Sequence, residues 1–119
     1  MGGGTVTEPE VVNQLVIATT ASMQAGPLTE RLVRDGFYVT QVNSSGGLLY
    51  EATVSLLIGL DKRRLARVLT HIRECCPTRR RFVPTYIEPP VFEAQSMMIE
   101  ADVGGAKVYV LDVEYFERL

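Results

Sequence analysis

Two adjacent serines and two adjacent glycines stand between two segments that have the composition of β-strands. Ser44 and Ser45 offer hydroxyl groups, while Gly46 and Gly47 leave backbone N–H groups uncovered, a combination that suits a concave anion-binding turn. The same residues also close an ordinary hairpin, because serine and glycine favour turns. Two interpretations of this turn therefore stand side by side: a cradle for a phosphate, or a simple reversal of the chain.

The other residue types that perform catalysis are scattered. His71 is the only histidine, and it falls between apolar residues of a predicted helix, where a packing or surface role is expected. Cys75 and Cys76 are adjacent and have no second pair to complete a zinc site, so we interpret them as reduced thiols, one of them facing the core. Glu100 and Asp102 would share one strand face, where two carboxylates could bind a cation or act as an acid–base pair; alternating surface charge is the interpretation that we favour. Nucleophilic catalysis and zinc chemistry therefore lack support in this sequence, and we expect no metal site.

The elements that must position the turn begin with a strand from Gln14 to Ala21, which is short and rich in β-branched residues. A helix is predicted from Pro27, which suits a first helical position, to Gly36, which supplies a left-handed stop. The strand "FYVTQVN" follows, and after the serine–glycine turn "ATVSLLIGL" is the strongest strand pattern of the chain. Asp61 is the expected N-cap of a second helix, which Pro77 ends.

The segment from Thr78 to Ser96 breaks this pattern. Its three prolines, the first of them Pro84, predict a functional or mobile loop without a regular internal element. "MMIEADV" and "AKVYVLDV" then read as two strands, which Gly104 and Gly105 would join as a hairpin. The whole order predicts an α+β fold, a ferredoxin-like βαββαβ sandwich with an additional C-terminal strand.

Length and composition bound the organisation of the chain. Residues 14–119 are expected to form a single domain, with residues 1–13 as a flexible N-terminal tail. Because "VSLLIGL" is apolar on both strand faces and two helices cover only one face, we expect self-association, with a trimer of sheets as its natural closure. The net charge of −2 makes no case for a nucleic acid polymer as partner. The absence of a signal-peptide pattern and of a membrane-length apolar run predicts a cytoplasmic protein without a membrane partner.

Three segments, taken in order and spacing, resemble the cyclic-di-AMP receptor family, a branch of the P-II-like signalling proteins. They are "GFYVTQVNSSGGLL", "LIGL" before the second helix, and "VGGAKVYVLDVEYFERL" at the end. The resemblance covers the chain from Leu15 to the C-terminus and is weakest between Pro77 and Gln95. It implies a homotrimer of ferredoxin-like subunits with a nucleotide, cyclic di-AMP, at each subunit interface. The resemblance implies that such a protein is not an enzyme and has no cofactor. Binding of the nucleotide would reorder loops and change the partner that the protein engages.

The resemblance also implies roles for individual residues. Thr40 would hydrogen-bond an adenine edge, Gly46 and Gly47 would present backbone N–H groups to a phosphate, and Gly59 would let the ligand approach a strand closely. The full set of implied ligand-binding residues is Thr40, Ser45, Gly46, Gly47, Leu48, Leu49, Thr53, Gly59 and Arg118.

The sequence departs from the family pattern within this set. Leu48 replaces an aromatic residue, Tyr50 stands where the family has arginine, and Thr53 where it has asparagine. Glu51 adds a negative charge beside the implied phosphate site, where a like charge costs about 1–4 kcal/mol near a protein surface. Arg118 supplies a positive charge that can compensate, because the equivalent family position is polar and near the ligand.

Alternative interpretations remain. In the first, the trimer has lost the nucleotide and acts as a protein-interaction module through the 78–96 loop, where the basic stretch "TRRRF" grips an acidic partner. A metal-binding trimer, like the divalent-cation-tolerance proteins, is disfavoured because plausible loop positions lack histidine and cysteine. RNA binding is disfavoured because "KVYVLDVEYF" lacks the Lys/Arg-Gly-Phe pattern. An acylphosphatase-type enzyme is disfavoured because it would need an arginine in the loop after the first strand, and that loop, "TTASMQAG", has none.

Overall fold

The computed structural model describes residues 11–44, 52–87 and 95–119, and the side chains of residues 11–43, 52–80 and 104–119 among them. Most of the predicted tail and all of the turn at 45–49 therefore lie outside the described residues. The elements in chain order are β1 (Gln14–Ala21), α1 (Ser22–Arg34), β2 (Val39–Ser44), β3 (Thr53–Leu60), η1 (Lys62–Arg64), α2 (Leu65–Cys75), β4 (Thr78–Ile87), β5 (Gln95–Gly104) and β6 (Ala106–Asp112).

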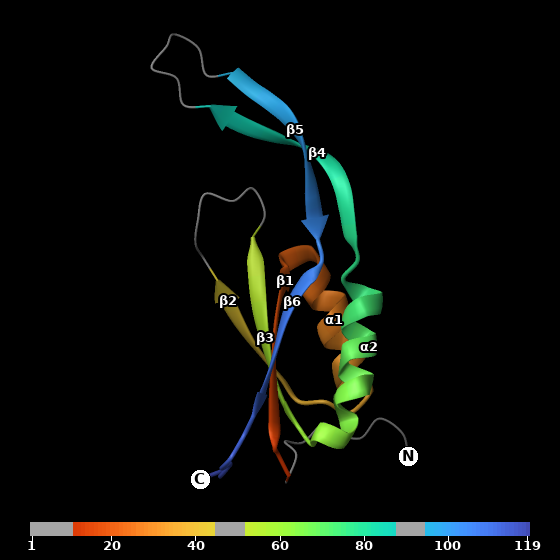
Figure 1. The fold of residues 1–119 in the computed structure, drawn as a ribbon, viewed down its shortest axis with the longest axis vertical. Coiled ribbons are helices and arrows are strands. Elements are labelled where there is room, and N and C mark those ends of the chain that lie inside the picture. The colour runs from red at the N-terminus through yellow and green to blue at the C-terminus, as the bar shows by residue number, and fades with distance from the viewer. Residues whose placement is uncertain (1–10, 45–51, 88–94) are drawn as a thin grey trace.

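Four of these strands form one antiparallel sheet in the order β2-β3-β1-β6. β1 lies inside the sheet and pairs with β3 on one side and with β6 on the other. Both helices lie against the same face of the sheet, and no described element covers the opposite face (Figure 1). This confirms the predicted α+β arrangement of an antiparallel sheet with two helices on one face. The strand order is compatible with a ferredoxin-like fold.

The hydrophobic core lies between the sheet and the helices, because alternate strand residues point to the helices. Along β3, buried residues alternate with half-buried ones on the other face. The buried strand positions are Val16, Ala18, Val54, Leu56, Ile58 and Leu60, and the helices add Leu28, Leu32, Val68 and Ile72. Cys76 also faces this core, and Cys75 is half-buried at its edge, so the prediction of one core-facing thiol is confirmed.

Helix α1 begins earlier than the sequence predicts. It begins at Ser22, so Pro27 lies inside the helix and is not its first residue. Part of the clash that a proline ring makes in a helix is with the Cβ of the preceding residue, and that residue is Gly26, which has none. The predicted start was wrong because it treated the proline as a boundary irrespective of the glycine before it. The predicted stop is confirmed, since Gly36 follows the helix with a φ of 87°.

Asp61 caps the second helical segment, as predicted. Its carboxylate accepts a hydrogen bond from the backbone N–H of Arg63 at 3.0 Å. The same carboxylate forms an ion pair with the Arg63 side chain. These contacts lower the pKa of Asp61 to about 2; the hydrogen bond from the Arg63 side chain is the largest cause, and the bond from its backbone N–H is the second. Asn13, counted in the predicted tail, is held nearby: its backbone N–H donates to Leu60 O and its side-chain oxygen accepts from Lys62 N–H.

Strands β4 and β5 form a two-stranded antiparallel ribbon, the arm, which projects beyond the sheet (Figure 1). The prediction that no regular element would form between Thr78 and Ser96 was wrong. Pro84 lies within β4, opposite Met98 of β5. A two-stranded ribbon tolerates a proline because one edge of each strand has N–H groups that need no partner. Residues 88–94, with the other two prolines, lie outside the described residues.

Gly104 and Gly105 do not form the predicted hairpin. β5 pairs with β4, whereas β6 pairs with β1, so the two glycines connect the arm to the sheet. Their φ angles of 84° and 82° fall in the left-handed region, where a side chain is strained. A Cβ on Gly104 would also lie 2.5 Å from the carbonyl oxygen of Pro77. The glycine pair correctly indicates a sharp bend, but two strands that flank a bend can each pair with a different neighbour.

Candidate functional site

The uncovered face of the sheet carries a hollow of about 310 Å³, which we call the open-face hollow. The strand residues that line it alternate with the buried core positions, so they belong to the face that points away from the helices. The strand register brings Thr40 opposite Leu57 and Leu15 opposite Gly59. The hollow is lined by Val12, Leu15, Tyr38, Thr40, Leu57, Gly59, Val113 and Phe116.

Two of the predicted ligand-binding residues, Thr40 and Gly59, meet in this hollow. They come from β2 and β3, which pair side by side. The lack of a side chain at Gly59 matters here, because a Cβ would lie 3.2 Å from Cγ1 of Val12. The glycine thus lets Val12 pack closely against the strand at the edge of the hollow.

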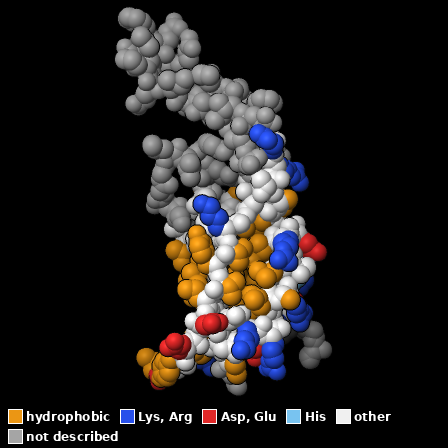
Figure 2. Space-filling model, viewed as in Figure 1, with side chains coloured by type: hydrophobic (Ala, Val, Ile, Leu, Met, Phe, Trp, Pro, Cys, Tyr) orange, Lys and Arg blue, Asp and Glu red, His pale blue; other side chains and the backbone are white. Residues whose placement is uncertain are grey.

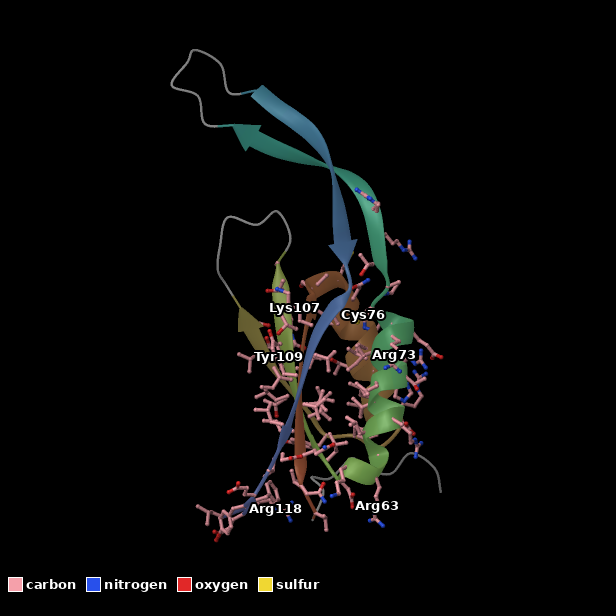
Figure 3. All side chains as sticks on the ribbon, viewed as in Figure 1. Arg63, Arg73, Cys76, Lys107, Tyr109 and Arg118 are labelled. Carbon is pink, nitrogen blue, oxygen red and sulfur yellow. The ribbon has the colours of Figure 1, made fainter. Side chains whose placement is uncertain are left out.

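The structure does not bring Thr53 to the same place. Thr53 begins β3, opposite Ser44 of β2, whereas Gly59 lies near the end of that strand. The six-residue separation corresponds to about 20 Å along an extended strand. Arg118 is exposed two residues beyond Phe116, near the C-terminus (Figure 3). Ser45, Gly46, Gly47, Leu48 and Leu49 lie outside the described residues.

The chemistry of the open-face hollow is that of a binding pocket for a flat, mostly apolar group. Tyr38 and Phe116, each 40% exposed, contribute aromatic rings, and Thr40 contributes a hydroxyl that can donate or accept a hydrogen bond. Among the described residues that line it, Tyr38 alone has a titratable side chain. Sequence reasoning did not assign Tyr38 and Phe116 to the site. The alternation of "FYVTQ", which places Tyr38 on the same strand face as Thr40, is the signal that identifies the first of them.

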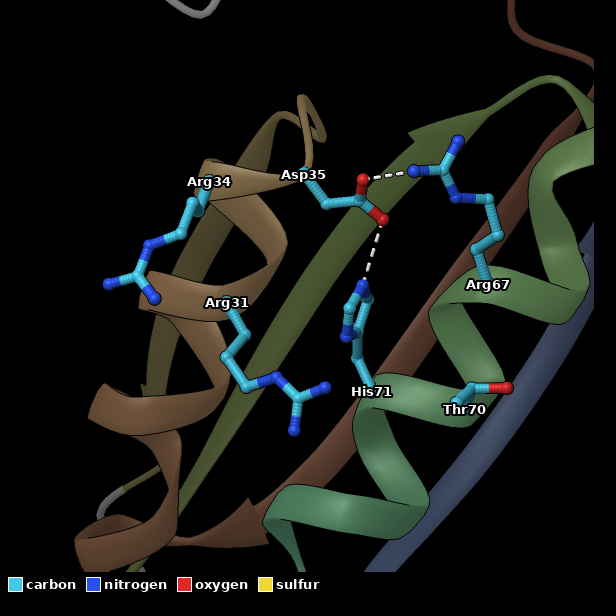
Figure 4. Close-up of a pocket in the computed structure, with 6 residues that line it drawn as sticks. All are labelled: Arg31, Arg34, Asp35, Arg67, Thr70 and His71. Atoms are coloured by element: carbon cyan, nitrogen blue, oxygen red, sulfur yellow. Dashed lines mark hydrogen bonds and ion pairs between the residues drawn. The ribbon is translucent and has the colours of Figure 1, made fainter. Parts of the chain in front are cut away.

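A second hollow, of about 450 Å³, lies between α1 and α2 on their outer side, and we call it the helix groove (Figure 4). It is lined by Arg31, Arg34, Asp35, Arg67, Thr70 and His71. Asp35 lies at its centre and accepts hydrogen bonds from His71 Nε2 at 2.8 Å and from Arg67. The bond from His71, followed by the charge of Arg67, lowers the pKa of Asp35. His71 on α2 therefore bonds to the residue that directly follows α1, in keeping with the predicted packing or surface role.

The two thiols differ in their surroundings. Cys76 accepts a hydrogen bond from Thr20 at 3.3 Å, and burial raises the pKa of its thiol. Cys75 is half-buried beside Arg31, whose Nη1 lies 3.6 Å from the sulfur. Among the residues that the structure describes, no three metal-ligating side chains gather in one place. No described helix combines the length and apolar character needed to span a bilayer.

Comparison with known protein families identifies one match. The sequence profile of the cyclic-di-AMP receptor family matches residues 13–119, which include the helix groove, the arm and every lining residue of the open-face hollow except Val12. Among solved structures, the crystal structure of a functionally unknown protein from Pediococcus pentosaceus is similar, with 29% sequence identity and a TM-score of 0.67. The similarity covers 91% of this chain and 98% of that chain. The chain therefore belongs to the cyclic-di-AMP receptor family.

Proposed function

We propose that this protein is a non-catalytic, P-II-like signalling protein that binds cyclic di-AMP where the subunits of a homotrimer meet. Nucleotide binding rearranges its loops and so changes its interaction with a cytoplasmic partner. Family membership supports a nucleotide-binding signalling role in general. The observation that carries the finer proposal is the open-face hollow, where Thr40 and Gly59 lie beside the rings of Tyr38 and Phe116.

The hollow suits an adenine base better than it suits a phosphate. Leu15, Leu57 and Val113 give it apolar walls, and stacking of a base on an aromatic ring contributes about 1–3 kcal/mol. The Thr40 hydroxyl can bond an edge of the base, as the family resemblance implies. Groups outside the hollow would then bind the phosphates. We propose the backbone of the 45–49 turn and the Arg118 side chain for this role.

The exposed apolar surface of the sheet supports a homotrimer. Tyr38, Val42, Tyr109 and Leu111 are each at least 40% exposed, and they belong to strands or strand ends of the uncovered face. Figure 2 shows hydrophobic side chains gathered around the edge strand β6. An apolar surface of this kind marks an interaction site. A neighbouring subunit that covers it would also close the open-face hollow, which places the nucleotide between subunits.

The test is a calorimetric titration of the purified protein with cyclic di-AMP, with ATP, ADP, AMP and cyclic di-GMP as competitors. We compare the wild type with Thr40→Val, which keeps the shape of the side chain and removes the hydroxyl. Loss of one hydrogen bond predicts a rise in Kd of roughly 2- to 10-fold. The matched control is Thr70→Val on α2, whose hydroxyl donates to Ala66 O on the far side of the helices and whose loss should leave Kd unchanged.

One cyclic di-AMP per subunit, with weaker binding by Thr40→Val alone, supports the proposal. If neither cyclic di-AMP nor any competitor binds to a folded trimer, the nucleotide role is wrong for this chain. Equal effects of the two valine variants would place the ligand away from the open-face hollow.

The arm gives the alternative function a structural basis. The ribbon of β4 and β5 extends away from the sheet, and Arg79 and Arg80 are exposed near its base. In this alternative the trimer binds an acidic protein partner through the arm, with or without a nucleotide. Reversing the charges of Arg79, Arg80 and Arg81 should then abolish partner binding and leave cyclic di-AMP binding intact; an unchanged partner affinity would exclude the arm.

A further inference from the structure

Positive charge gathers on the helical side of the protein. The segments 22–36 and 61–76 contain seven arginines and lysines against four carboxylates, whereas the whole chain has 12 against 14. In Figure 2 blue side chains follow the side of the molecule on which α2 lies in Figure 1. The helices therefore form a positively charged layer on a chain whose remaining residues are acidic. This layer lies on the opposite side of the sheet from the open-face hollow.

The helix groove presents this charge in a concave form. Arg67 is 59% exposed, and only its Nη2 is engaged by Asp35, which leaves most of the five guanidinium N–H donors available. Arg34 forms no ion pair with another described residue, and in Figure 4 it extends outward from α1. Arg31 is paired with Glu74, but the pair is 37% and 55% exposed, and exposed pairs are readily exchanged for another partner.

We propose that the helix groove is a docking site for an acidic segment of a protein partner, whose Asp or Glu side chains bind Arg34 and Arg67. The site is separate from the nucleotide pocket and does not depend on it. The groove already accommodates a guanidinium–carboxylate pair, since Arg67 binds Asp35 within it, and Arg31, which also lines it, binds Glu74. Arginine forks match carboxylates in geometry, so a carboxylate-bearing chain fits the donors that remain.

Charge also favours a short acidic peptide over a polyanion. A phosphate carries up to two negative charges and would lie beside the carboxylates of Asp35 and Glu74, whereas a single carboxylate meets less repulsion. A long polyanion such as nucleic acid would extend past the groove onto the acidic remainder of the chain. A peptide that spans only the groove avoids that surface.

The experiment measures binding of a fluorescein-labelled oligoglutamate peptide to the full-length protein by fluorescence anisotropy at several salt concentrations. Arg34→Glu should weaken binding by about tenfold or more, the loss expected for one charge-assisted hydrogen-bonded pair. The matched control is Lys107→Glu, which changes the net charge equally but lies on β6, opposite Thr19 and on the uncovered sheet face. Its affinity for the peptide should stay within about twofold of the wild type, as expected where interactions between distant exposed charges are screened. A second comparison, Arg79→Glu, tests whether the peptide binds the arm instead of the helix groove.

The proposal is overturned if the wild type does not bind oligoglutamate, or if Arg34→Glu and Lys107→Glu weaken binding equally. Preference for a DNA oligonucleotide or heparin over oligoglutamate, with the same sensitivity to Arg34→Glu, would assign the groove to a polyanion and also overturn it. Cyclic di-AMP titrations on the same variants keep the two proposals distinct, because Arg34→Glu should leave nucleotide binding unchanged. Should Arg34→Glu fail to fold, Arg34→Gln provides the same comparison with a smaller change.

Discussion

The bend between the arm and the sheet allows a quantitative test of the structure. Gly36 and Gly104 both have a φ near +85°, so alanine at either position costs about 1–2 kcal/mol from the left-handed backbone alone. At Gly36 the added Cβ meets only Arg64 Nη2 at 3.6 Å, an ordinary contact. At Gly104 it would lie 2.5 Å from Pro77 O, a backbone atom that cannot move without its neighbours.

An added Cβ at Gly104 would displace Pro77 O, and this displacement should weaken the two hydrogen bonds that the oxygen accepts. Pro77 O accepts from the backbone N–H of Gly105 at 3.2 Å and from Gln24 Nε2 at 3.0 Å. Weakening both adds about 1 kcal/mol each, so Gly104→Ala should lower the free energy of unfolding by about 3–4 kcal/mol in all. Urea unfolding at one protein concentration, followed by circular dichroism, measures both variants. Equal destabilisation by Gly36→Ala and Gly104→Ala would refute the close approach of Pro77 and the bend built on it.

Three further predictions test the core and the helix pair. Hydrogen bonding by His71 lowers the pKa of Asp35 in the folded state below the unfolded value of 3.8. The carboxylate therefore stabilises the folded state at pH values above 3.8, and this contribution is lost as the pH falls through the lower folded pKa. The difference in stability between wild type and Asp35→Asn should therefore shrink on acidification below that range, and a difference that is constant with pH would contradict it. A thiol reagent should label Cys75 in the native protein and Cys76 only after unfolding, as peptide mapping can show; the reverse order would be inconsistent with the burial of Cys76. Leu56→Ala removes a fully buried side chain and should cost about 2–5 kcal/mol in urea unfolding, whereas a cost below about 1 kcal/mol would mean that the position is not in the core.

Local chemistry explains which features of the fold were predictable. The left-handed glycine after α1 and the aspartate cap at Asp61 depend on a few adjacent residues, so both could be predicted from the sequence. The arm could not, because Pro84 excludes a strand inside a sheet but not in a two-stranded ribbon, and the choice depends on a partner strand. Gly104 and Gly105 signalled a bend, whereas the pairing of β6 with β1 depends on residues about ninety positions away.

The candidate site also has residues that the sequence could predict and residues that it could not. Family resemblance assigned Thr40 and Gly59, and the sheet register places both in one hollow. Phe116 lies far along the chain from both, and only the pairing of β6 with β1 brings the C-terminal segment to the hollow. The helix groove was also beyond prediction, because Asp35 directly follows α1 while His71 belongs to α2, and their contact depends on how the two helices pack.

The most direct test of the nucleotide site is amide hydrogen exchange of the full-length protein with and without saturating cyclic di-AMP. Binding in the open-face hollow predicts slower exchange in the peptides that contain Thr40, Gly59 and Phe116, and unchanged exchange along the outer face of α2. Unchanged exchange in all three peptides, or protection confined to α1 and α2, would contradict the central claim.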